Sequence, residues 1–194
     1  GLADIFINDA FGSWQPHAST VNVSHYMPSY AGFLMQKEIM NLSHVMSPKK
    51  PFLAVVAGAK FDTKIGPLME IYKKVDWLIL GGVIYNAFLC AKYGIKIAGV
   101  NEEEIESAKN LLKRDAKEHK ILELKYLIES DKMGNKQEGH YREINTDNLK
   151  EGDSLGYVMD VSPKSFSQPE VTEIMLSAKT IFVNAVMGFT PHFY

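Results

Sequence analysis

Residues 55–65 read Val-Val-Ala-Gly-Ala-Lys-Phe-Asp-Thr-Lys-Ile, and this stretch decides how the chain is interpreted. An apolar strand runs into a turn of small residues, and Lys60 and Lys64 then stand four residues apart where a helix is expected to begin. Backbone N–H groups at the start of a helix, together with ammonium groups, favour the binding of an anion. The stretch therefore predicts a strand, an anion-binding turn and a helix.

Apolar runs and amphipathic segments alternate along the chain after residue 51. Strands that are buried on both faces read as continuous apolar runs, and helices supply the connections between parallel strands. The pattern therefore predicts an α/β fold, a Rossmann-like parallel sheet with helices on both faces. Strands are expected at residues 52–57, 77–80, 121–128, 157–160 and 180–183, and helices at residues 65–74, at residues 84–93, from Asn101 to about Lys117 and from about Pro169.

One of these expected helices carries a specific start signal. The Asn101 side chain can cap the helix, and Glu104 stands at the position that can return a hydrogen bond. Basic residues up to Lys117 place positive charge at the far end, where it complements the helix dipole. Residues 129–153, in contrast, are a polar stretch outside the alternating pattern, with turn signals at residues 133–135 and 151–153.

The first fifty residues follow a different pattern. A short apolar strand is expected at residues 5–7, and a loop at residues 12–19. Apolar positions then recur at spacings near three to five, which predicts a helix over residues 33–47. Pro48 and Pro51 end that helix and mark an expected domain edge.

The composition excludes several classes of protein. Of the 194 residues, 46% are hydrophobic and 23% are charged, which is typical of a globular protein. The net charge of −2 gives no reason to expect a nucleic-acid partner or an anionic membrane surface. We expect no membrane span and no signal peptide. The single cysteine, Cys90, allows no internal disulfide and fits the cytoplasm, and the unpaired spacing of the histidines predicts no metal site.

Three further motifs accompany the opening stretch. They read Asn-Asp-Ala-Phe-Gly at residues 8–12, Gly-Gly-Val-Ile-Tyr-Asn-Ala-Phe at residues 81–88 and Val-Asn-Ala-Val-Met-Gly at residues 183–188. In this order the four motifs resemble those of phosphoglycerate kinase, and the resemblance extends from Ile5 to about Met187. The chain looks like the central portion of such an enzyme, about half of a usual family member, and we expect a piece of a longer protein.

The resemblance implies an incomplete two-domain kinase. Residues 1–32 would belong to the N-terminal domain that binds the acidic substrate, residues 33–47 to the helix between domains, and residues 48–194 to the nucleotide-binding C-terminal domain. The implied reaction is phosphoryl transfer between 1,3-bisphosphoglycerate and ADP, giving 3-phosphoglycerate and ATP. It implies small-molecule substrates, a monomer, and Mg²⁺ bound with ADP or ATP through a protein ligand outside this chain.

The family motif Gly-Gly-Ala-Lys-x-x-x-Lys corresponds to residues 57–64. By this resemblance Gly58 and Ala59 line the nucleotide site, while Lys60 and Lys64 contact the nucleotide phosphates and the migrating phosphoryl group. In phosphoryl transfer an enzyme chiefly positions the groups and neutralises their charge, which ammonium groups can do. Spacing alone favours the reading of both lysines as solvated surface residues beside a tight turn, and it is the resemblance that assigns them to phosphate. Ala57 replaces the first glycine of the motif.

The remaining nucleotide-side candidates follow three expected strands. By resemblance, Gly81 and Gly82 line the adenosine pocket, although glycines there could also serve close packing of helix on sheet. Asn184 and Gly188 belong to the motif after the last strand, and Asp160 to a turn that could orient a loop or a ligand, or simply form the turn. The chain departs from the family pattern at Val83, at Ala185 and Val186, and at Pro191.

The acidic-substrate candidates are Asn8, Asp9 and His17. In the family the Asn-Asp motif is followed by a His-Arg-x-His segment, and here His17 remains while the arginine is absent. Losing an arginine that could bind carboxylate or phosphate with two hydrogen bonds is not a conservative change. His17 could also be an ordinary surface residue of the loop.

Two other functions were weighed against an active kinase. A catalytically silent family member, acting as a binding or structural protein, would explain the missing arginine and the altered motif after the last strand. An unrelated dinucleotide-binding domain is disfavoured because no G-x-G-x-x-G follows an expected strand. Since half of each site would be absent, we expect these 194 residues alone to be inactive.

Overall fold

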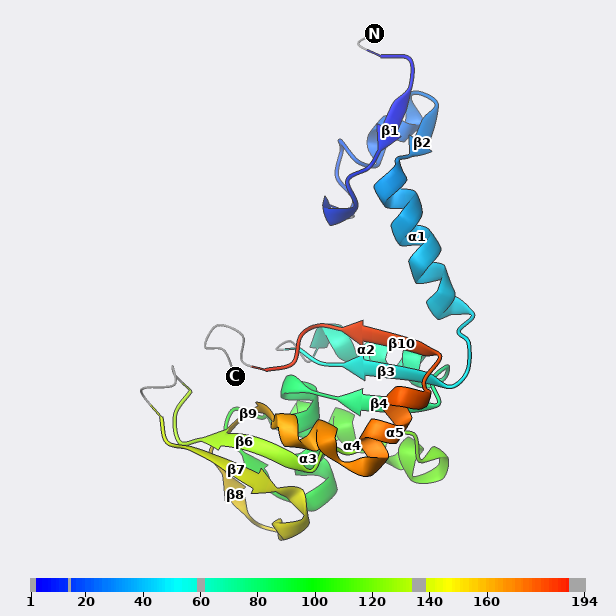
Figure 1. The fold of residues 1–194 in the computed structure, drawn as a ribbon. Helices are drawn as coiled ribbons and strands as arrows, with labels where there is room; N and C mark the ends of the chain where they lie inside the picture. The colour runs from blue at the N-terminus through cyan, green and yellow to red at the C-terminus, as the bar shows by residue number, and fades with distance from the viewer. Residues whose placement is uncertain (1–2, 14, 59–61, 134–138, 189–194) are drawn as a thin grey trace. The chain divides into compact units, whose positions relative to one another are not determined.

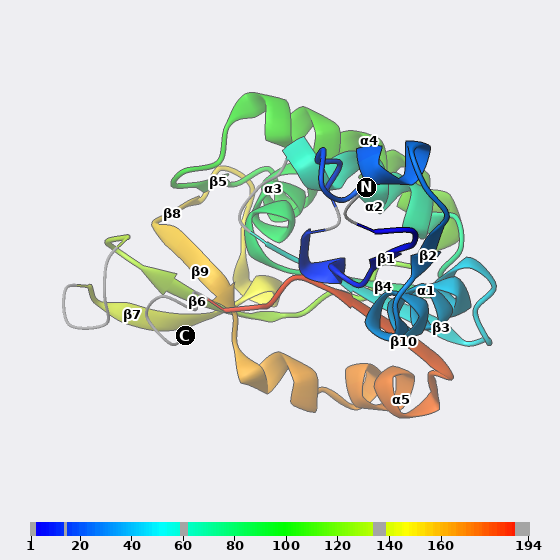
Figure 2. The same ribbon diagram turned by 90° about the horizontal axis from the view of Figure 1, so that it is seen from above.

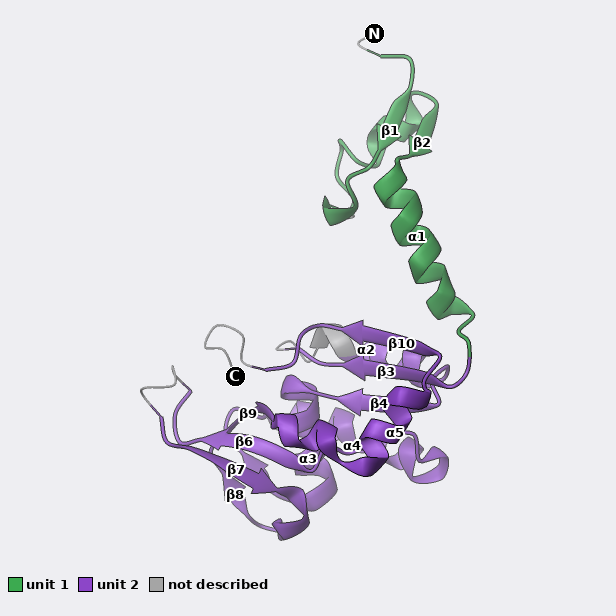
Figure 3. Ribbon diagram, viewed as in Figure 1, with its two compact units in different colours: residues 1–49 green, residues 50–194 purple. Residues whose placement is uncertain are grey.

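A computed structural model describes residues 3–13, 15–58, 62–133 and 139–188. The chain forms two compact units, Gly1–Lys49 and Lys50–Tyr194, which Figure 3 colours separately.

The first unit is built around one short pair of parallel strands. β1 (Phe6–Asn8) pairs with β2 (Ser29–Ala31), and α1 (Phe33–Met46) follows directly, as the sequence predicted for residues 33–47. Two 3-10 turns, η1 (Phe11–Ser13) and η2 (Asn22–His25), lie between the strands. No residue of α1 is buried.

The core of the second unit is a three-stranded parallel sheet in the order β10-β3-β4 (Figure 1). Its strands are β10 (Thr180–Asn184), β3 (Phe52–Val56) and β4 (Trp77–Leu80). All five residues of the central strand β3 are buried, as the continuous apolar run predicted. The three strands confirm the expectations at residues 52–57, 77–80 and 180–183.

Helices cover both faces of this sheet. They are α2 (Asp62–Tyr72), α3 (Gly82–Tyr93), α4 (Glu102–Glu118) and α5 (Pro169–Ser177). Figure 2 shows α5 on one face and α3 with α4 on the other. The predicted cap of α4 is present, since the Asn101 side chain accepts from the Glu104 N–H at 2.9 Å and Glu104 accepts from the Asn101 N–H at 3.0 Å. Among the described residues, no helix combines the length and apolarity needed to cross a membrane.

The expected single strand over residues 121–128 was wrong. Ile121 makes only an isolated parallel bridge to Leu78, and the chain then enters a separate antiparallel sheet in the order β7-β6-β9. Its strands are β6 (Tyr126–Ser130), β7 (Tyr141–Asn145) and β9 (Tyr157–Val161). Residues 157–160 are therefore a strand as predicted, but an antiparallel one outside the parallel sheet.

The polar stretch at residues 129–153 contains the strand β7, which the sequence did not predict. Among its polar side chains, one forms an ion pair with the neighbouring strand. Glu129 of β6 is buried, and its carboxylate accepts hydrogen bonds from Arg142 of β7 and from the Gly156 N–H, the latter at 2.6 Å. Polar side chains paired in this way give no apolar signal in the sequence. The short elements β5 (Lys96–Ile97), β8 (Ser154–Leu155), η3 (Thr146–Asn148) and η4 (Pro163–Ser167) complete the unit.

Tyr85 ties α3 to the segment between the two sheets. Its hydroxyl donates to the Leu124 carbonyl at 2.8 Å and accepts from the Leu124 N–H at 3.1 Å, and both residues are buried. Burial raises the pKa of the Tyr85 phenol well above its ordinary value, so the hydroxyl stays protonated as a donor.

We expect Tyr85→Phe to lower the free energy of unfolding by about 1–3 kcal/mol, because both backbone groups of the buried Leu124 lose this partner. Urea denaturation measures the change. Tyr26→Phe is the control, since Tyr26 is 84% exposed and its substitution should change stability by less than about 0.5 kcal/mol. Equal stability of the two variants would contradict the assigned role of the hydroxyl.

Candidate functional site

The carboxyl ends of the three parallel strands meet at one edge of the sheet. The turns that leave them are fastened by backbone hydrogen bonds, from the Ala57 N–H to the Asn184 carbonyl at 3.0 Å and from the Gly81 N–H to the Val56 carbonyl at 3.0 Å. The Val83 N–H also donates to the Gly58 carbonyl at 3.2 Å. Ligands of open parallel sheets bind at this edge, so these turns form the candidate site.

Two glycines let these turns approach one another closely. Gly82 has φ of +59°, and a Cβ there would lie 2.6 Å from the Gly58 carbonyl oxygen. A Cβ on Gly81 would lie 2.7 Å from the Met187 Cε and 3.0 Å from the Ala57 Cβ. Contact with the Gly58 backbone and a positive φ therefore require glycine at position 82, whereas at position 81 the nearest atom is the flexible end of Met187.

Asp160 lies at the end of β9 and reaches toward the same edge. Its side chain is buried; Oδ1 accepts from the Gly82 N–H at 3.1 Å and from the Val161 N–H at 2.8 Å. Oδ2 accepts from the Gly188 N–H at 2.5 Å. The structure therefore brings together Gly82, Asp160 and Gly188, three residues that the sequence had placed in three different motifs.

A cleft of about 580 Å³ opens between these turns and the antiparallel sheet. Its lining is mostly apolar and includes Gly58, Gly82, Val83, Asn86, Ala98, Gly99, Val100, Met133, Tyr157, Val158, Met159, Asp160, Ala185, Val186 and Gly188. An apolar cleft of this size with few polar groups suits a flat organic group such as a base and its sugar. Val83 and Val186, two departures from the family pattern, are part of this lining.

Sequence reasoning missed one wall of this cleft. The wall comes from residues 98–100 and from Tyr157 and Val158 at the start of β9. Asn86 belongs to the motif at residues 81–88, where the sequence indicates no role for it. It is buried, and its Nδ2 donates to the Val158 carbonyl at 2.9 Å, which joins α3 to β9. In the sequence, the local sign of this wall is Gly99, a glycine that suits a turn. In the structure its φ is +85°.

The lysine candidates are less completely placed. Ala59 and Lys60 lie outside the described residues. Lys64 belongs to α2, which begins at Asp62, but its side chain lies outside what the structure describes. Their predicted contacts with phosphate stay predictions.

The acidic-substrate candidates lie together in the first unit. Asn8 Oδ1 accepts from the Ala10 N–H at 3.0 Å, and its Nδ2 donates to the Thr20 carbonyl at 3.1 Å. The exposed His17 joins the same turn, because its N–H donates to the Thr20 hydroxyl at 3.1 Å. Asp9 instead accepts from the Met35 N–H at 2.9 Å and so caps α1.

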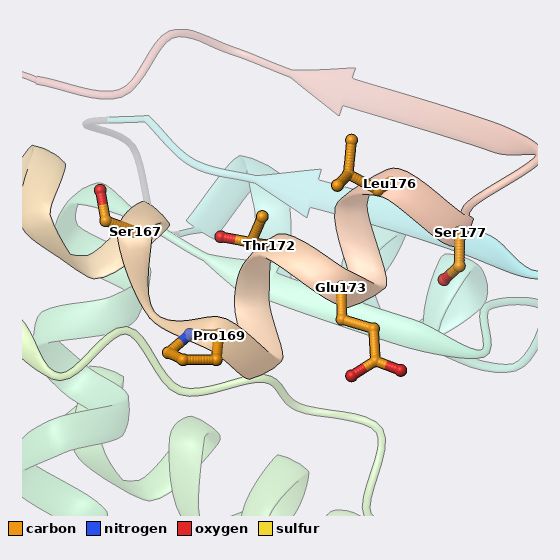
Figure 4. Close-up of a pocket in the computed structure, with 6 residues that line it drawn as sticks. All are labelled: Ser167, Pro169, Thr172, Glu173, Leu176 and Ser177. Atoms are coloured by element: carbon orange, nitrogen blue, oxygen red, sulfur yellow. The ribbon is translucent and has the colours of Figure 1, made fainter.

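A second hollow, of about 690 Å³, runs along α5 (Figure 4). It is more open than the cleft, and its lining comes from one continuous segment, η4 and α5: Ser167, Pro169, Thr172, Glu173, Leu176 and Ser177. Groups from other elements do not converge on it, so the cleft at the sheet edge is the better candidate site. Within the described part of the chain, no group of three or more His, Cys, Asp and Glu residues could hold a metal ion.

A parallel sheet with helices on both faces and glycine turns at its carboxyl edge defines a Rossmann-like α/β protein with a ligand cleft. The family model described as phosphoglycerate kinase matches residues 1–193. The chain belongs to the phosphoglycerate kinase family.

Individual relatives agree with this assignment. The phosphoglycerate kinase of Pseudothermotoga lettingae is 36% identical over 192 residues, which cover 96% of this chain and 47% of the relative. The phosphoglycerate kinase structure from Coxiella burnetii superposes with a TM-score of 0.81 at 31% identity, over 98% of this chain and 49% of that chain. The structure from Pyrococcus horikoshii, at 23% identity and a TM-score of 0.69, shows the same fold. The chain thus spans about half the length of the relatives that it matches.

The close approach of the two turns can be tested with a pair of glycine substitutions. We expect Gly82→Ala to lower the free energy of unfolding by roughly 2–5 kcal/mol, because strain at positive φ and a collision with the Gly58 carbonyl both contribute. Gly152→Ala is the matched control: its φ is +88°, but no atom lies within 4 Å of the added Cβ. It should cost only the strain, about 1–2 kcal/mol. Equal losses in urea denaturation would show that the collision does not occur.

Proposed function

We propose that the chain is part of a phosphoglycerate kinase that transfers a phosphoryl group between 1,3-bisphosphoglycerate and ADP, giving 3-phosphoglycerate and ATP. The observation that carries this proposal is the apolar cleft at the carboxyl edge of the parallel sheet, lined by Gly58, Gly82 and Gly188. Family membership supplies the reaction. The named relatives are all phosphoglycerate kinases, and nothing among them favours the catalytically silent alternative.

In this proposal the cleft receives the nucleoside part of ADP. Its apolar walls suit a base and ribose, and the residues proposed to form the nucleotide site are Gly58, Ala59, Gly81, Gly82, Asp160, Asn184 and Gly188. The phosphates would extend toward Lys60 and Lys64 at the start of α2, where helix N–H groups and ammonium groups favour anions. These lysines would neutralise charge on the migrating phosphoryl group without forming a covalent intermediate.

The described residues do not fit a protein site for magnesium at this edge. Asp160, the described carboxylate that hydrogen-bonds to these turns, already accepts three backbone hydrogen bonds. A magnesium ion would enter with the nucleotide, and the prediction that its protein ligand lies outside this chain stands as a proposal.

The acidic substrate would bind to the other domain. We propose residues 1–32 as part of that domain, residues 33–47 as the helix about which the domains close, and residues 48–194 as part of the nucleotide domain. Asn8, Asp9 and His17 would then hold the phosphoglycerate, with Asn8 and His17 ordered through Thr20. Closure would align the reacting groups and exclude water. We also propose a cytoplasmic monomer.

The lysine assignment is tested by titrating this chain with ADP and magnesium in a calorimeter. We expect binding in the micromolar to sub-millimolar range, and Lys64→Ala should raise the Kd at least about tenfold, because a charge-assisted hydrogen bond to phosphate is worth about 1.5–3 kcal/mol. Lys73→Ala is the control, since Lys73 is exposed and pairs with Glu70. Binding that both substitutions weaken equally would overturn the lysine assignment, and no binding by any of the three proteins would overturn the proposed nucleotide site.

A further inference from the structure

One carboxylate joins three segments that are distant in sequence. Asp160 belongs to β9 of the antiparallel sheet, whereas its partners Gly82 and Gly188 follow strands of the parallel sheet. These two partners stand 78 and 28 residues from Asp160 along the chain. All three residues line the cleft. Asp160 is therefore the link between the two sheets at the point where the candidate site opens.

The burial of this carboxylate makes the link strong. Asp160 is 6% exposed, and a carboxylate removed from water needs hydrogen-bond donors to replace its hydration. Backbone N–H groups supply them here, and such charge-assisted bonds are about twice as strong as neutral ones. If the carboxylate is removed, the Gly82 and Gly188 N–H groups both lose an acceptor.

The bond to Gly188 restrains a segment under strain. Ala185, directly after β10, has φ of +68°, a conformation that costs a non-glycine residue about 1–2 kcal/mol. The chain then passes Val186 and Met187 before it reaches the Gly188 N–H. The hydrogen bond at 2.5 Å from Gly188 to Asp160 therefore helps to fix the path of this wall of the cleft.

The same geometry shows which part of a nucleotide Asp160 can affect. Gly82 is the first residue of α3, so the carboxylate occupies the N-terminus of this helix. The next N–H, that of Val83, is taken by the Gly58 carbonyl. A phosphate placed there would meet a carboxylate instead of free donors. The cleft beside Asp160 therefore suits an uncharged group.

We propose that Asp160 is a positioning residue for the nucleoside. Its carboxylate holds the Gly82 turn and the Gly188 segment at the separation that fits the base and ribose, and it does so through backbone hydrogen bonds without contacting the ligand. This inference rests on the proposed nucleotide site. It predicts that loss of the carboxylate weakens binding of the nucleoside and leaves binding of the phosphates unchanged.

The test compares Asp160→Asn with Asp115→Asn. Asp115 is the control because its carboxylate, like that of Asp160, accepts three hydrogen bonds, yet it does not line the cleft. Its Oδ1 accepts from the Tyr72 hydroxyl at 2.8 Å and from the N–H groups of Lys120 and Ile121 at 2.8 and 3.0 Å. Adenosine and pyrophosphate serve as separate probes in calorimetry. Urea midpoints record the stability of each variant.

We expect Asp160→Asn to weaken adenosine binding about tenfold, as the loss of one hydrogen bond would. Its affinity for pyrophosphate should stay within about twofold of the wild type, and Asp115→Asn should leave both affinities unchanged. Equal weakening of adenosine and pyrophosphate binding, or unchanged adenosine binding, would overturn the proposal.

Amide hydrogen exchange separates this inference from the proposed function. Asparagine keeps one side-chain oxygen, so in Asp160→Asn the exchange of at least one of the Gly82 and Gly188 amides should rise at least tenfold, whereas Asp115→Asn should leave both unchanged. If the wild type binds neither adenosine nor ADP, the nucleotide site is refuted, and faster exchange still establishes that Asp160 fastens the two segments. Unchanged exchange at both amides would refute the fastening itself.

Discussion

The burial of β3 on both faces is the constraint on which the second unit depends. Phe52, Leu53 and Ala54 have no exposed surface, and the strand pairs with β10 along one edge and with β4 along the other. A strand enclosed in this way needs helices on both faces of the sheet and crossover connections between its parallel neighbours. Those connections bring the carboxyl ends of all three strands to one edge, which is where the cleft lies.

At that edge, backbone rather than side chains forms much of the site. The turn at Gly82 touches the carbonyl of Gly58, and no side chain could stand between them. Backbone walls can lie close to a flat ligand, but they need to be held at the right spacing. A buried carboxylate from another sheet supplies that restraint, so the stability of the antiparallel sheet and the shape of the cleft are linked through Asp160.

Local pattern predicted much of the fold because the relevant forces are local. Residues 52–57 are continuously apolar, and residues 101–104 contain a complete helix cap, so β3 and the start of α4 could be placed from sequence. The antiparallel sheet could not be placed from the sequence in this way. Its strand β7 is polar, and it is stabilised by Arg142 pairing with the buried Glu129, a contact between residues thirteen apart that no periodicity reveals.

For the candidate site, the apolar runs predict which turns follow the parallel strands, and hence that Gly58, Gly81, Gly82 and Asn184 lie at one edge. The order of four motifs indicates the family. How those turns are held together, and what completes the cleft, follows from contacts between segments that are distant in sequence. In the sequence Asp160 is a candidate whose role, turn former or site residue, stays open. It becomes the link between two sheets because folding brings the Gly82 and Gly188 N–H groups within hydrogen-bonding distance of its buried carboxylate.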